Sequence, residues 1–471
     1  MGVRVSQNTM LDISQDRLMR CNPKTLSLAK TILSLSNNIK FPCMRLKDVF
    51  KIKSGYAFKS EDYTDEGTSV FRIGDIENNF KVEDMPKLPE EYSALFSKYL
   101  LNANDIVVSL TGDGNLKVDI IPEYLNNKLL LNQRVGCLRP LDKLCNIDFY
   151  YYLLSSLNII KYQFTYYSNG KTQLNISPFD FLNIKCPQIP DNIQKILIQK
   201  IQPLQNSIQK YIGQLYDDRF IINEVFNKLF QFNEKKLYEL QKEKYNSLTL
   251  SDFANNKDMR NSWKFHCKSA QYAYNELKSR FCTKIKDFIS EPIVLGTSIS
   301  PSDYDENGEY RYLSMASIKT WQYDNDSAQI VSDIYANNNS KKVKKDDIII
   351  ARSGEGTIGK VALIDNDDIN AIFCDFTMRI HLNNYNPAFA YYYFRTDFFQ
   401  ELIYGHKKGL GNNTNIFPVQ IQEFPIPDIS LDEQQKIVNE IQSKINEQNK
   451  IKNQIEELRN SIDKIIEETI C

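Results

Sequence analysis

The feature that most constrains the fold of this 471-residue chain is an internal repeat. The segment 102–121, "NANDIVVSLTGDGNLKVDII", aligns with 344–364, "KKDDIIIARSGEGTIGKVALI", and Asp105 falls 242 residues before Asp347. A sequence that repeats in order over its whole length predicts two similar structural units. Further pairs keep the same order: "VFRIGDI" (70–76) with "YLSMASI" (312–318), "DFYYYLLSS" (148–156) with "AFAYYYFRT" (388–396), and "QIPDNIQKILIQKIQ" (188–202) with "PIPDISLDEQQKIVNEIQ" (425–442).

Each unit has two parts of different character. The first part mixes short apolar runs with Gly, Asn and Asp turns and some helical stretches, which predicts an α+β domain. The second part begins at Ile-Pro-Asp, and proline followed by aspartate is a typical helix start. The predicted bounds are a first domain at 1–188, a helix at 189–245, a second domain at 246–427 and a helix at 428–471.

Apolar residues recur at steps of three and four along both predicted helices, which is typical of a coiled-coil seam. Asp218 is the one polar break in the first seam. Pro203 costs about 3 kcal/mol inside a regular helix, so we predict a kink or a late start there. The seam of the second helix slips in phase between 445 and 451, which predicts a local irregularity. The predicted interface residues are Leu197, Ile201, Leu204, Ile208, Leu215 and Ile222 in the first helix, and Ile441, Ile445, Ile455, Leu458 and Ile462 in the second.

Two helices with one apolar stripe each bury those stripes best against one another. Forty helical residues extend for about 60 Å, and one turn of DNA measures roughly 34 Å. Such a helical spacer could hold two similar domains one to two DNA turns apart.

Charge and cysteine content limit the class of protein. A net charge of −1 is not that of a protein that coats DNA, so a nucleic-acid site would need locally gathered basic residues or other subunits. Nine cysteines stand singly without a C-x-x-C pair, which predicts reduced, mostly buried thiols and no zinc site. No apolar run approaches the ~20 residues of a membrane helix, and the N-terminus lacks a secretory signal. We expect a cytoplasmic protein without a membrane partner.

The stretch "RSGEGTIGKV" (352–361) contains both the P-loop and the dinucleotide glycine patterns. A P-loop needs a hydroxyl after its lysine and a helix behind it. Val361 stands in that position, and the following residues predict a strand, so we expect a glycine hairpin between two strands. Glycine allows close approach to a phosphate, but a solvated surface turn explains the segment equally well.

Three further segments are rich in groups that can contact nucleic acid. "KIKSGYAFKS" (51–60) interleaves lysines and aromatics, although a solvated strand end is the commoner explanation. "SNGKTQ" (168–173) and "GHKKGLGNNTN" (405–415) are polar loops at matching places in the two units, with side chains that can bond base edges. The candidate contacts are Lys51, Lys53, Ser54, Lys59, Arg72, Ser109, Thr111, Asn115, Lys117, Lys171, Thr172, Gln173, Arg352, Ser353, Thr357, Lys360, Lys407, Lys408, Asn412, Asn413 and Thr414.

No catalytic constellation is found in the sequence. "NPAF" (386–389) is similar to an adenine methyltransferase loop, but Ala388 replaces the second proline and no glycine-rich cofactor loop precedes it. The three histidines share no ligand spacing. We therefore expect neither catalytic residues nor a bound metal. A stand-alone DNA-binding regulator, a coiled-coil scaffold and a nucleotide-binding enzyme remain as alternatives.

The repeated motifs resemble those of the specificity subunits of type I restriction–modification enzymes. The resemblance is carried by "LKDVFKIKSGYAFKSEDY", "GTSVFRIGDI", "SNGKTQLNIS" and "IPDNIQKILIQKIQ" with their second copies, and covers about 45 to 471. It implies two target-recognition domains, each followed by a long helix, with the two helices packed as an antiparallel coiled coil in a pseudo-two-fold repeat. Pro203 and Gly213 depart from an uninterrupted first helix. The first 40 residues partly echo 260–278, so we expect them to open the first unit.

The resemblance also implies the function. Such a subunit binds an asymmetric, two-part sequence in double-stranded DNA and docks two adenine-methyltransferase subunits, with motor-nuclease (restriction) subunits joining for cleavage. It performs no chemistry and holds no cofactor, because S-adenosylmethionine, ATP and Mg²⁺ are used by the partner subunits. Defence against foreign DNA through DNA methylation is the expected role.

Overall fold

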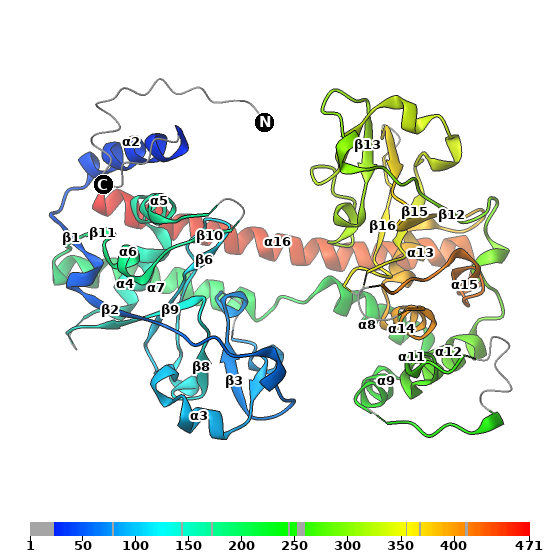
Figure 1. Cartoon of the computed structure of the whole chain (residues 1–471), viewed down its shortest axis with the longest axis horizontal. Helices are drawn as coiled ribbons and strands as arrows, with labels where there is room; N and C mark the ends of the chain where they lie inside the picture. Colours follow the sequence, from blue (N-terminus) through cyan, green and yellow to red (C-terminus); the bar gives the residue numbers. More distant parts are fainter. Residues whose placement is uncertain are drawn as a thin grey trace. The chain divides into compact units, whose positions relative to one another are not determined.

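The computed structural model describes residues 23–77, 80–142, 145–170, 173–243, 245–251, 260–354, 356–366, 369–409 and 413–471, and for 23 and 24 the backbone only. The chain forms two compact units (Figure 1). Unit 1 comprises Met1–Gln214 and Lys452–Cys471, and unit 2 comprises Leu215–Ile451. Each unit therefore contains one copy of the repeat, but unit 1 also takes the last residues of the chain.

Unit 1 is built on two larger sheets, with two short two-stranded sheets beside them: β1 (Cys43–Arg45) with β11 (Lys185–Pro187), and β6 (Thr111–Gly112) with β10 (Leu174–Asn175). The first larger sheet is antiparallel with the order β2-β9-β5-β7, and the second has the order β4-β3-β8 with β3 and β8 parallel. Val107 and Cys137 of the first sheet share a buried cluster with Leu129 and Leu131 of the second, so the core of the domain includes the space between the sheets. The strands are β2 (Phe50–Ser54), β3 (Thr68–Phe71), β4 (Lys87–Leu88), β5 (Ile106–Ser109), β7 (Val118–Ile120), β8 (Leu129–Leu131) and β9 (Val135–Pro140).

Unit 2 repeats both larger sheets strand for strand. Its antiparallel sheet has the order β12-β18-β15-β16, and its second sheet has the order β14-β13-β17 with β13 and β17 parallel. The register is repeated as well, because Ile106 pairs with Leu138 as Ile348 pairs with Ile380. The predicted duplication is confirmed. The strands are β12 (Val294–Leu295), β13 (Tyr310–Leu313), β14 (Gln329–Val331), β15 (Asp347–Ala351), β16 (Val361–Leu363), β17 (Ala371–Phe373) and β18 (Thr377–His381).

The helices that follow the sheets correspond as well. The Asn146 side chain caps α4 by accepting a bond from the backbone N–H of Phe149, and Asn386 caps α13 through Phe389 in the same way. The repeated caps explain why both helices begin at matching positions. Unit 1 has α4 (Ile147–Ser156), α5 (Asn158–Tyr167) and α6 (Pro178–Leu182), and unit 2 has α13 (Pro387–Phe394), α14 (Asp397–His406) and α15 (Pro418–Ile421).

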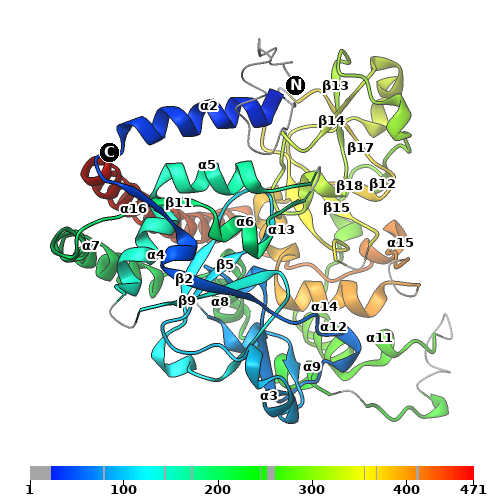
Figure 2. The same ribbon diagram turned by 60° about the vertical axis from the view of Figure 1, so that its left-hand side comes forward.

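The N-terminal helix belongs to the repeat. Helix α2 (Pro23–Asn38) packs along α5, as Figure 2 shows from a second side, and α12 (Lys268–Arg280) packs on α14. Because α5 and α14 are equivalent, α2 and α12 are equivalent too. The first 40 residues open unit 1 as predicted, for the part that the structure describes.

The predicted single helix over 189–245 is wrong. Helix α7 (Asp191–Ile212) ends before Gly213, and α8 (Asp218–Phe230) starts after Asp217, whose side chain accepts a bond from the Arg219 N–H. A third helix, α9 (Glu234–Gln241), follows. Asp218 therefore lies in a first helical turn, where its charge favours the helix dipole, and not in the middle of a seam.

Pro203 lies inside α7, and the helix begins at Asp191. The late start that we offered as one effect of this proline is therefore wrong. Proline removes one backbone donor, and Pro203 is placed on an exposed face of the helix, where water can bond the carbonyl that is left without a partner. The Ser207 hydroxyl donates to the Pro203 carbonyl at 3.0 Å.

The irregularity predicted around 445–451 is also wrong. Helix α16 (Leu431–Ile470) is continuous over 40 residues. Gln448 is buried, and it lies seven residues after Ile441 and seven before Ile455, which are buried too. The seam therefore keeps its period, with a polar side chain in one apolar position.

The helices pair within each unit. In unit 2, Ile222 and Phe226 of α8 share a core cluster with Val438 and Ile441 in the first part of α16. In unit 1, residues of α7 and of the last turns of α16 line one cavity. Within unit 1, α7 lies beside the C-terminal part of α16, and within unit 2, α8 lies beside its N-terminal part. This order agrees with the predicted antiparallel pairing. Of the predicted seam, Leu197, Ile201, Ile208, Ile222, Ile441, Ile455 and Ile462 are buried, and Leu204, Leu215, Ile445 and Leu458 are partly buried.

No helix among the described residues combines the length and the apolar character needed to cross a membrane.

Candidate functional site

In unit 1 three loops lie side by side and are tied by backbone hydrogen bonds. They are the turn 132–134 after β8, the hairpin 110–116 after β5, and the loop 168–176 after α5. The Leu110 N–H donates to the Arg134 carbonyl at 3.0 Å, and the Leu110 carbonyl accepts from the Ile176 N–H at 2.9 Å. We call this arrangement the three-loop face.

Unit 2 has the same three-loop face, formed by 374–376, 352–359 and 407–416 as far as these residues are described. The Arg352 N–H donates to the Phe376 carbonyl at 2.9 Å, and the Arg352 carbonyl accepts from the Ile416 N–H at 2.9 Å. The glycine hairpin and the polar loop, which were separate features of the sequence, are thus neighbours in both units.

The hairpin that carries the P-loop pattern differs from the strand–loop–helix arrangement of a P-loop or dinucleotide site. It joins β15 to β16, which pair antiparallel from Ile350 and Val361 outward. Lys360 is followed directly by the strand β16, so among the described residues of this hairpin no helix N-terminus faces the glycines. Gly354 has a φ of 85°, in the left-handed region that glycine tolerates. The predicted hairpin is confirmed.

The exposed polar side chains differ between the two faces. In unit 1, Asn115 and Gln173 are exposed, and the Asn115 amide donates to Asp113 at 3.2 Å. The backbone N–H of Asn115 also bonds Asp113 and lowers the pKa of that carboxyl. In unit 2, Lys408 and Asn413 are exposed.

Arg134 was missed by the sequence analysis. It is exposed in the turn 132–134, and its guanidinium makes no hydrogen bond or ion pair with the described residues. The equivalent residue of unit 2 is Phe376, which is 47% exposed. Arg134 lies outside every polar segment named in the sequence analysis. Only the hydrogen bond from the Leu110 N–H to its carbonyl places it at the site.

Four predicted contact residues are withdrawn because they lie inside the protein. Ser109 and Ser353 are buried at the ends of their strands, Thr414 is fully buried, and Lys407 is buried beside Tyr404. The Ser109 hydroxyl accepts from the Lys117 N–H at 3.0 Å, so it holds the hairpin together. Groups that are sealed in this way cannot contact a ligand without rearrangement.

Several basic candidates are partly engaged by the protein. Lys360 donates to the Lys319 carbonyl at 2.9 Å, and burial lowers the pKa of Lys360. The Arg352 guanidinium donates to the Asp375 carbonyl at 2.6 Å and lies 5.7 Å from the ring of Phe417. Such residues hold the loops in place.

The predicted basic and aromatic patch around 51–60 lies at the end of β2 (Phe50–Ser54). Lys53 donates to the carbonyl of Lys98 and lies over the ring of Tyr99 at 5.1 Å. Burial is the main cause that lowers the pKa of Lys53. Tyr56 packs on Phe96 with ring centroids 4.6 Å apart and is 40% exposed, so the aromatics form a cluster of their own.

The remaining candidates divide by exposure. Lys171, Thr172 and Asn412 lie outside the described residues. Lys51, Lys59, Arg72, Asn115, Gln173, Lys408 and Asn413 are exposed, and Lys53, Ser54, Thr111, Lys117, Arg352, Thr357 and Lys360 are partly buried.

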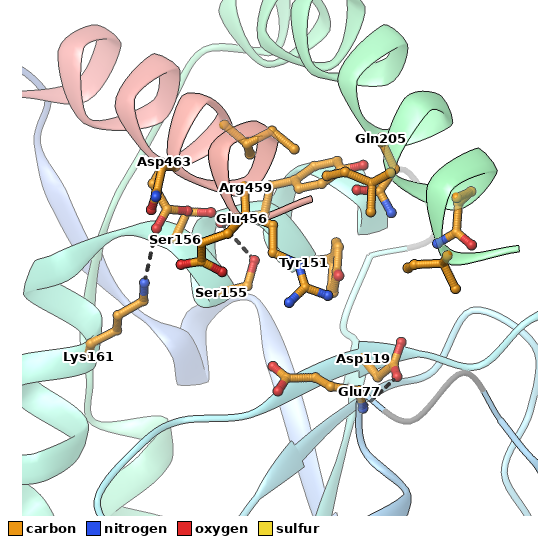
Figure 3. Close-up of a pocket in the computed structure, with 16 residues that line it drawn as sticks. Glu77, Asp119, Tyr151, Ser155, Ser156, Lys161, Gln205, Glu456, Arg459 and Asp463 are labelled. Carbon is orange, nitrogen blue, oxygen red and sulfur yellow. Dashed lines mark hydrogen bonds and ion pairs between the residues drawn. The ribbon is translucent and has the colours of Figure 1, made fainter. Parts of the chain in front are cut away.

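A polar cavity of about 290 Å³ lies between β7, α4, α7 and α16 in unit 1 (Figure 3). Asp119 of β7 accepts the Glu77 N–H at 3.0 Å, and burial raises the pKa of Asp119 to about 6. Arg459 of α16 points into the cavity toward Tyr151 of α4. Lys161 and Asp463 lie 3.5 Å apart at its edge. Acids and bases are mixed here, and the described residues contain no group of three or more metal-ligating side chains.

Comparisons with known proteins agree with the repeat. The family model described as "Type I restriction modification DNA specificity domain" matches twice, at 38–215 and 283–458. The specificity subunit of the type I restriction enzyme MjaVIII from Methanocaldococcus jannaschii is 29% identical over 172 residues, which are 35% of this chain and 40% of that protein. The EcoAI specificity subunit from Escherichia coli is 28% identical over 172 residues, 35% of this chain and 28% of that protein.

The matched segment thus spans less than half the length of either relative. Among solved structures, the type I restriction–modification S subunit from M. genitalium covers 92% of this chain and 97% of its own, with 16% identity and a TM-score of 0.39.

Proposed function

Because this chain belongs to the type I restriction–modification DNA specificity family, we propose that it recognises an asymmetric, two-part DNA sequence for a methyltransferase and nuclease complex. One observation carries the proposal. The same three-loop face occurs in both units with the same backbone hydrogen bonds, yet with different exposed side chains. A shared frame with different side chains suits two recognition domains that bind different half-sites.

The exposed residues supply two kinds of contact. Arg134 in unit 1 and Lys408 in unit 2 are positive and exposed, so they suit phosphates, which fix position along the duplex. Gln173 in unit 1 and Asn413 in unit 2 carry amides that can both donate to and accept from a base edge, with adenine as the best match. Base discrimination then comes from the loops, and the strands beneath hold them rigid.

The chemistry belongs to partner subunits in this proposal. Methyl transfer to adenine requires the base to leave the stack and enter a pocket, and such a pocket would be that of a methyltransferase subunit. Two methyltransferase subunits and motor-nuclease subunits are the proposed partners, and they would use S-adenosylmethionine, ATP and Mg²⁺. A net charge of −1 fits a subunit that shares DNA binding with others. The cytoplasm, where the DNA lies, is the proposed location.

Reconstitution with the methyltransferase subunit distinguishes this proposal from its alternatives. Purified chain, with and without the methyltransferase subunit, is titrated onto DNA fragments from a random library at fixed salt. Tight, sequence-selective binding that appears only with the methyltransferase supports the proposal. Equally tight and selective binding by the chain alone would make it a stand-alone regulator, and loss of selectivity in both samples would leave a scaffold.

A further inference from the structure

Besides the cavity of unit 1, a cavity of about 250 Å³ lies in unit 2, beside α14. It lies between the end of α9, the short helix α11 (Trp263–His266), the start of α12 and the middle of α14. The walls include two acidic and two aromatic side chains, which are Glu243, Glu401, Trp263 and Tyr404. None of these four residues belongs to the three-loop face.

Glu401 is the unusual residue of this cavity. Its side chain lines the cavity and is only 7% exposed. One carboxylate oxygen, Oε2, accepts a bond from the Gln241 amide at 2.7 Å. The other, Oε1, is fully buried and has no hydrogen-bond partner among the described residues. A buried carboxylate oxygen left unbonded costs roughly 1–3 kcal/mol or more, so a hydrogen-bond donor that reaches it is bound favourably.

The two charged residues of the described cavity lining, Glu243 and Glu401, are both acidic. The Glu243 carboxylate is already paired with Lys268 across a 2.5 Å contact. A carboxylate cannot donate the hydrogen bond that Glu401 Oε1 lacks. Lys264 and Lys407 lie over the ring of Tyr404, at 5.8 and 5.0 Å, and neither bonds Oε1.

Trp263 is 42% exposed and forms part of the wall. An indole face attracts ammonium and guanidinium groups within about 6 Å. The cavity holds several water-sized volumes of about 30 Å³, which is enough for the end of an alkyl chain with its charged group.

We propose that this cavity binds an alkylammonium or alkylguanidinium group. A rotation of the Glu401 carboxylate brings Oε1 to the cavity, where the cation donates a charge-assisted hydrogen bond to it, and the ring of Trp263 covers the carbon chain of the cation. Two sources have this chemistry: a free polyamine or arginine, and a lysine or arginine side chain of the methyltransferase subunit. The second source rests on the proposed function, and the first does not.

The two tryptophans of the chain provide the assay. Trp263 lines the cavity and Trp321 does not, and there are no others. Full-length protein labelled with 5-fluorotryptophan gives two fluorine resonances, assigned with the Trp263→Phe variant. Titration with n-butylammonium or n-butylguanidinium at constant ionic strength is expected to shift the Trp263 resonance alone. The neutral n-butanol is expected to shift neither.

The key variant is Glu401→Gln, which keeps the shape of the side chain and removes its charge. The apparent affinity for both cations is expected to fall at least about tenfold, since a charge-assisted bond becomes a neutral one. The matched control is Glu423→Gln, which removes an exposed carboxylate of the same unit that is bound to Lys284 and Lys286. That control is expected to leave the titration unchanged.

Folding is checked independently. Because Oε1 is unpaired, the melting temperature of unliganded Glu401→Gln is expected to equal or exceed that of the parent protein. Absence of a cation-dependent shift of Trp263, or an equal shift in Glu401→Gln, overturns the proposal, and so does a shift that n-butanol reproduces.

Adding the methyltransferase subunit then shows which of the two sources supplies the cation. If its side chain fills the cavity, the complex shifts the Trp263 resonance without added cation, and n-butylguanidinium no longer acts. If free cations are the ligand, the titration is the same with and without that subunit. The titration of the isolated chain needs no partner, so failure of the proposed function and failure of this site are distinguishable.

Discussion

The side-chain carbonyl of Gln448 accepts a hydrogen bond from the backbone N–H of Tyr216 at 2.8 Å. Gln448 occupies an otherwise apolar position of the α16 seam, and Tyr216 lies in the break between α7 and α8. The first residues of a helix and the residues before it carry N–H groups without helical partners. The Gln448 side chain of α16 thus accepts from the Tyr216 N–H, which the break between α7 and α8 leaves without a helical partner.

Replacing Gln448 with alanine is expected to loosen this break. The Tyr216 N–H loses its partner and the seam loses buried contact, at a combined cost of about 1–2 kcal/mol. Native-state hydrogen exchange is expected to accelerate in peptides that cover 214–222. The neighbouring variant Asn449→Ala changes an exposed residue of the same helix and should leave those peptides as they were.

Alanine at Gly55 or Gly296 is expected to destabilise its own unit by about 3 kcal/mol or more. A Cβ at Gly55 would lie 2.1 Å from the Leu131 carbonyl oxygen, and one at Gly296 would lie 2.0 Å from that of Phe373. Both neighbours are backbone and cannot move aside cheaply. Hydrogen exchange of β8 and β9 measures the first variant, and tryptophan fluorescence measures the second because both tryptophans are in unit 2.

The control for the glycine variants is Gly74→Ala, where a Cβ would meet no atom within 4 Å. It should change the stability of unit 1 by no more than a small amount. A large loss there, or none at Gly55, would contradict the argument from close backbone approach.

His406 gives unit 2 a pH-dependent stability. Burial lowers its pKa from 6.5 to about 4, so the folded state binds fewer protons than the unfolded state between these values. Stability therefore rises with pH across this window and is lost as the pH falls from 6.5 toward 4, by up to about 3 kcal/mol from this residue. Above pH 6.5 the effect is complete and constant.

The variant His406→Phe isolates this contribution. The aromatic packing on Phe424, with ring centroids 4.9 Å apart, is kept, while the bond to the Leu402 carbonyl is lost at every pH. Urea unfolding followed by tryptophan fluorescence should show a free-energy difference between the two proteins that is flat above pH 6.5 and changes in favour of the variant at lower pH. A difference that stays flat down to pH 4 would show that the histidine does not titrate as proposed.

Arg134→Ala and Lys408→Ala are expected to weaken DNA binding by the reconstituted complex without changing its preferred sequence. Each removes one positive group near a phosphate, so the slope of log affinity against log salt should become shallower by about one. Lys195→Ala, an exposed lysine of α7, serves as the control. A changed sequence preference in either variant would assign the residue to bases.

The sequence was sufficient to predict the repeat and the two glycine hairpins, because the aspartate and the glycines have the same spacing in both units while the side chains between them differ. It was insufficient at Gln448. A glutamine between isoleucines looks like a slip in phase, and only the position of the Tyr216 N–H explains why a polar residue is tolerated there.

Two of the withdrawn contacts, Ser109 and Ser353, failed because the strands that carry or precede them are buried on both faces. Ile106 through Ser109 are all buried, so the alternation that normally separates inward from outward residues is absent. Ser109 and Ser353 looked accessible because they are polar, yet both are buried, and the Ser109 hydroxyl closes its hairpin from inside. Arg134 was missed for the converse reason, since it is brought to the face by a neighbouring strand and not by its own sequence context.

The central claim is that the two units recognise two different parts of one DNA target. Single-molecule sequencing of methylated DNA, from cells that express this chain with its methyltransferase, tests it directly when Gln173→Ala and Asn413→Ala are compared with the parent chain. The account predicts a methylated motif in two parts with a fixed gap, in which the first variant relaxes bases in one part only and the second variant in the other. One uninterrupted motif, or the same bases relaxed by both variants, would contradict it.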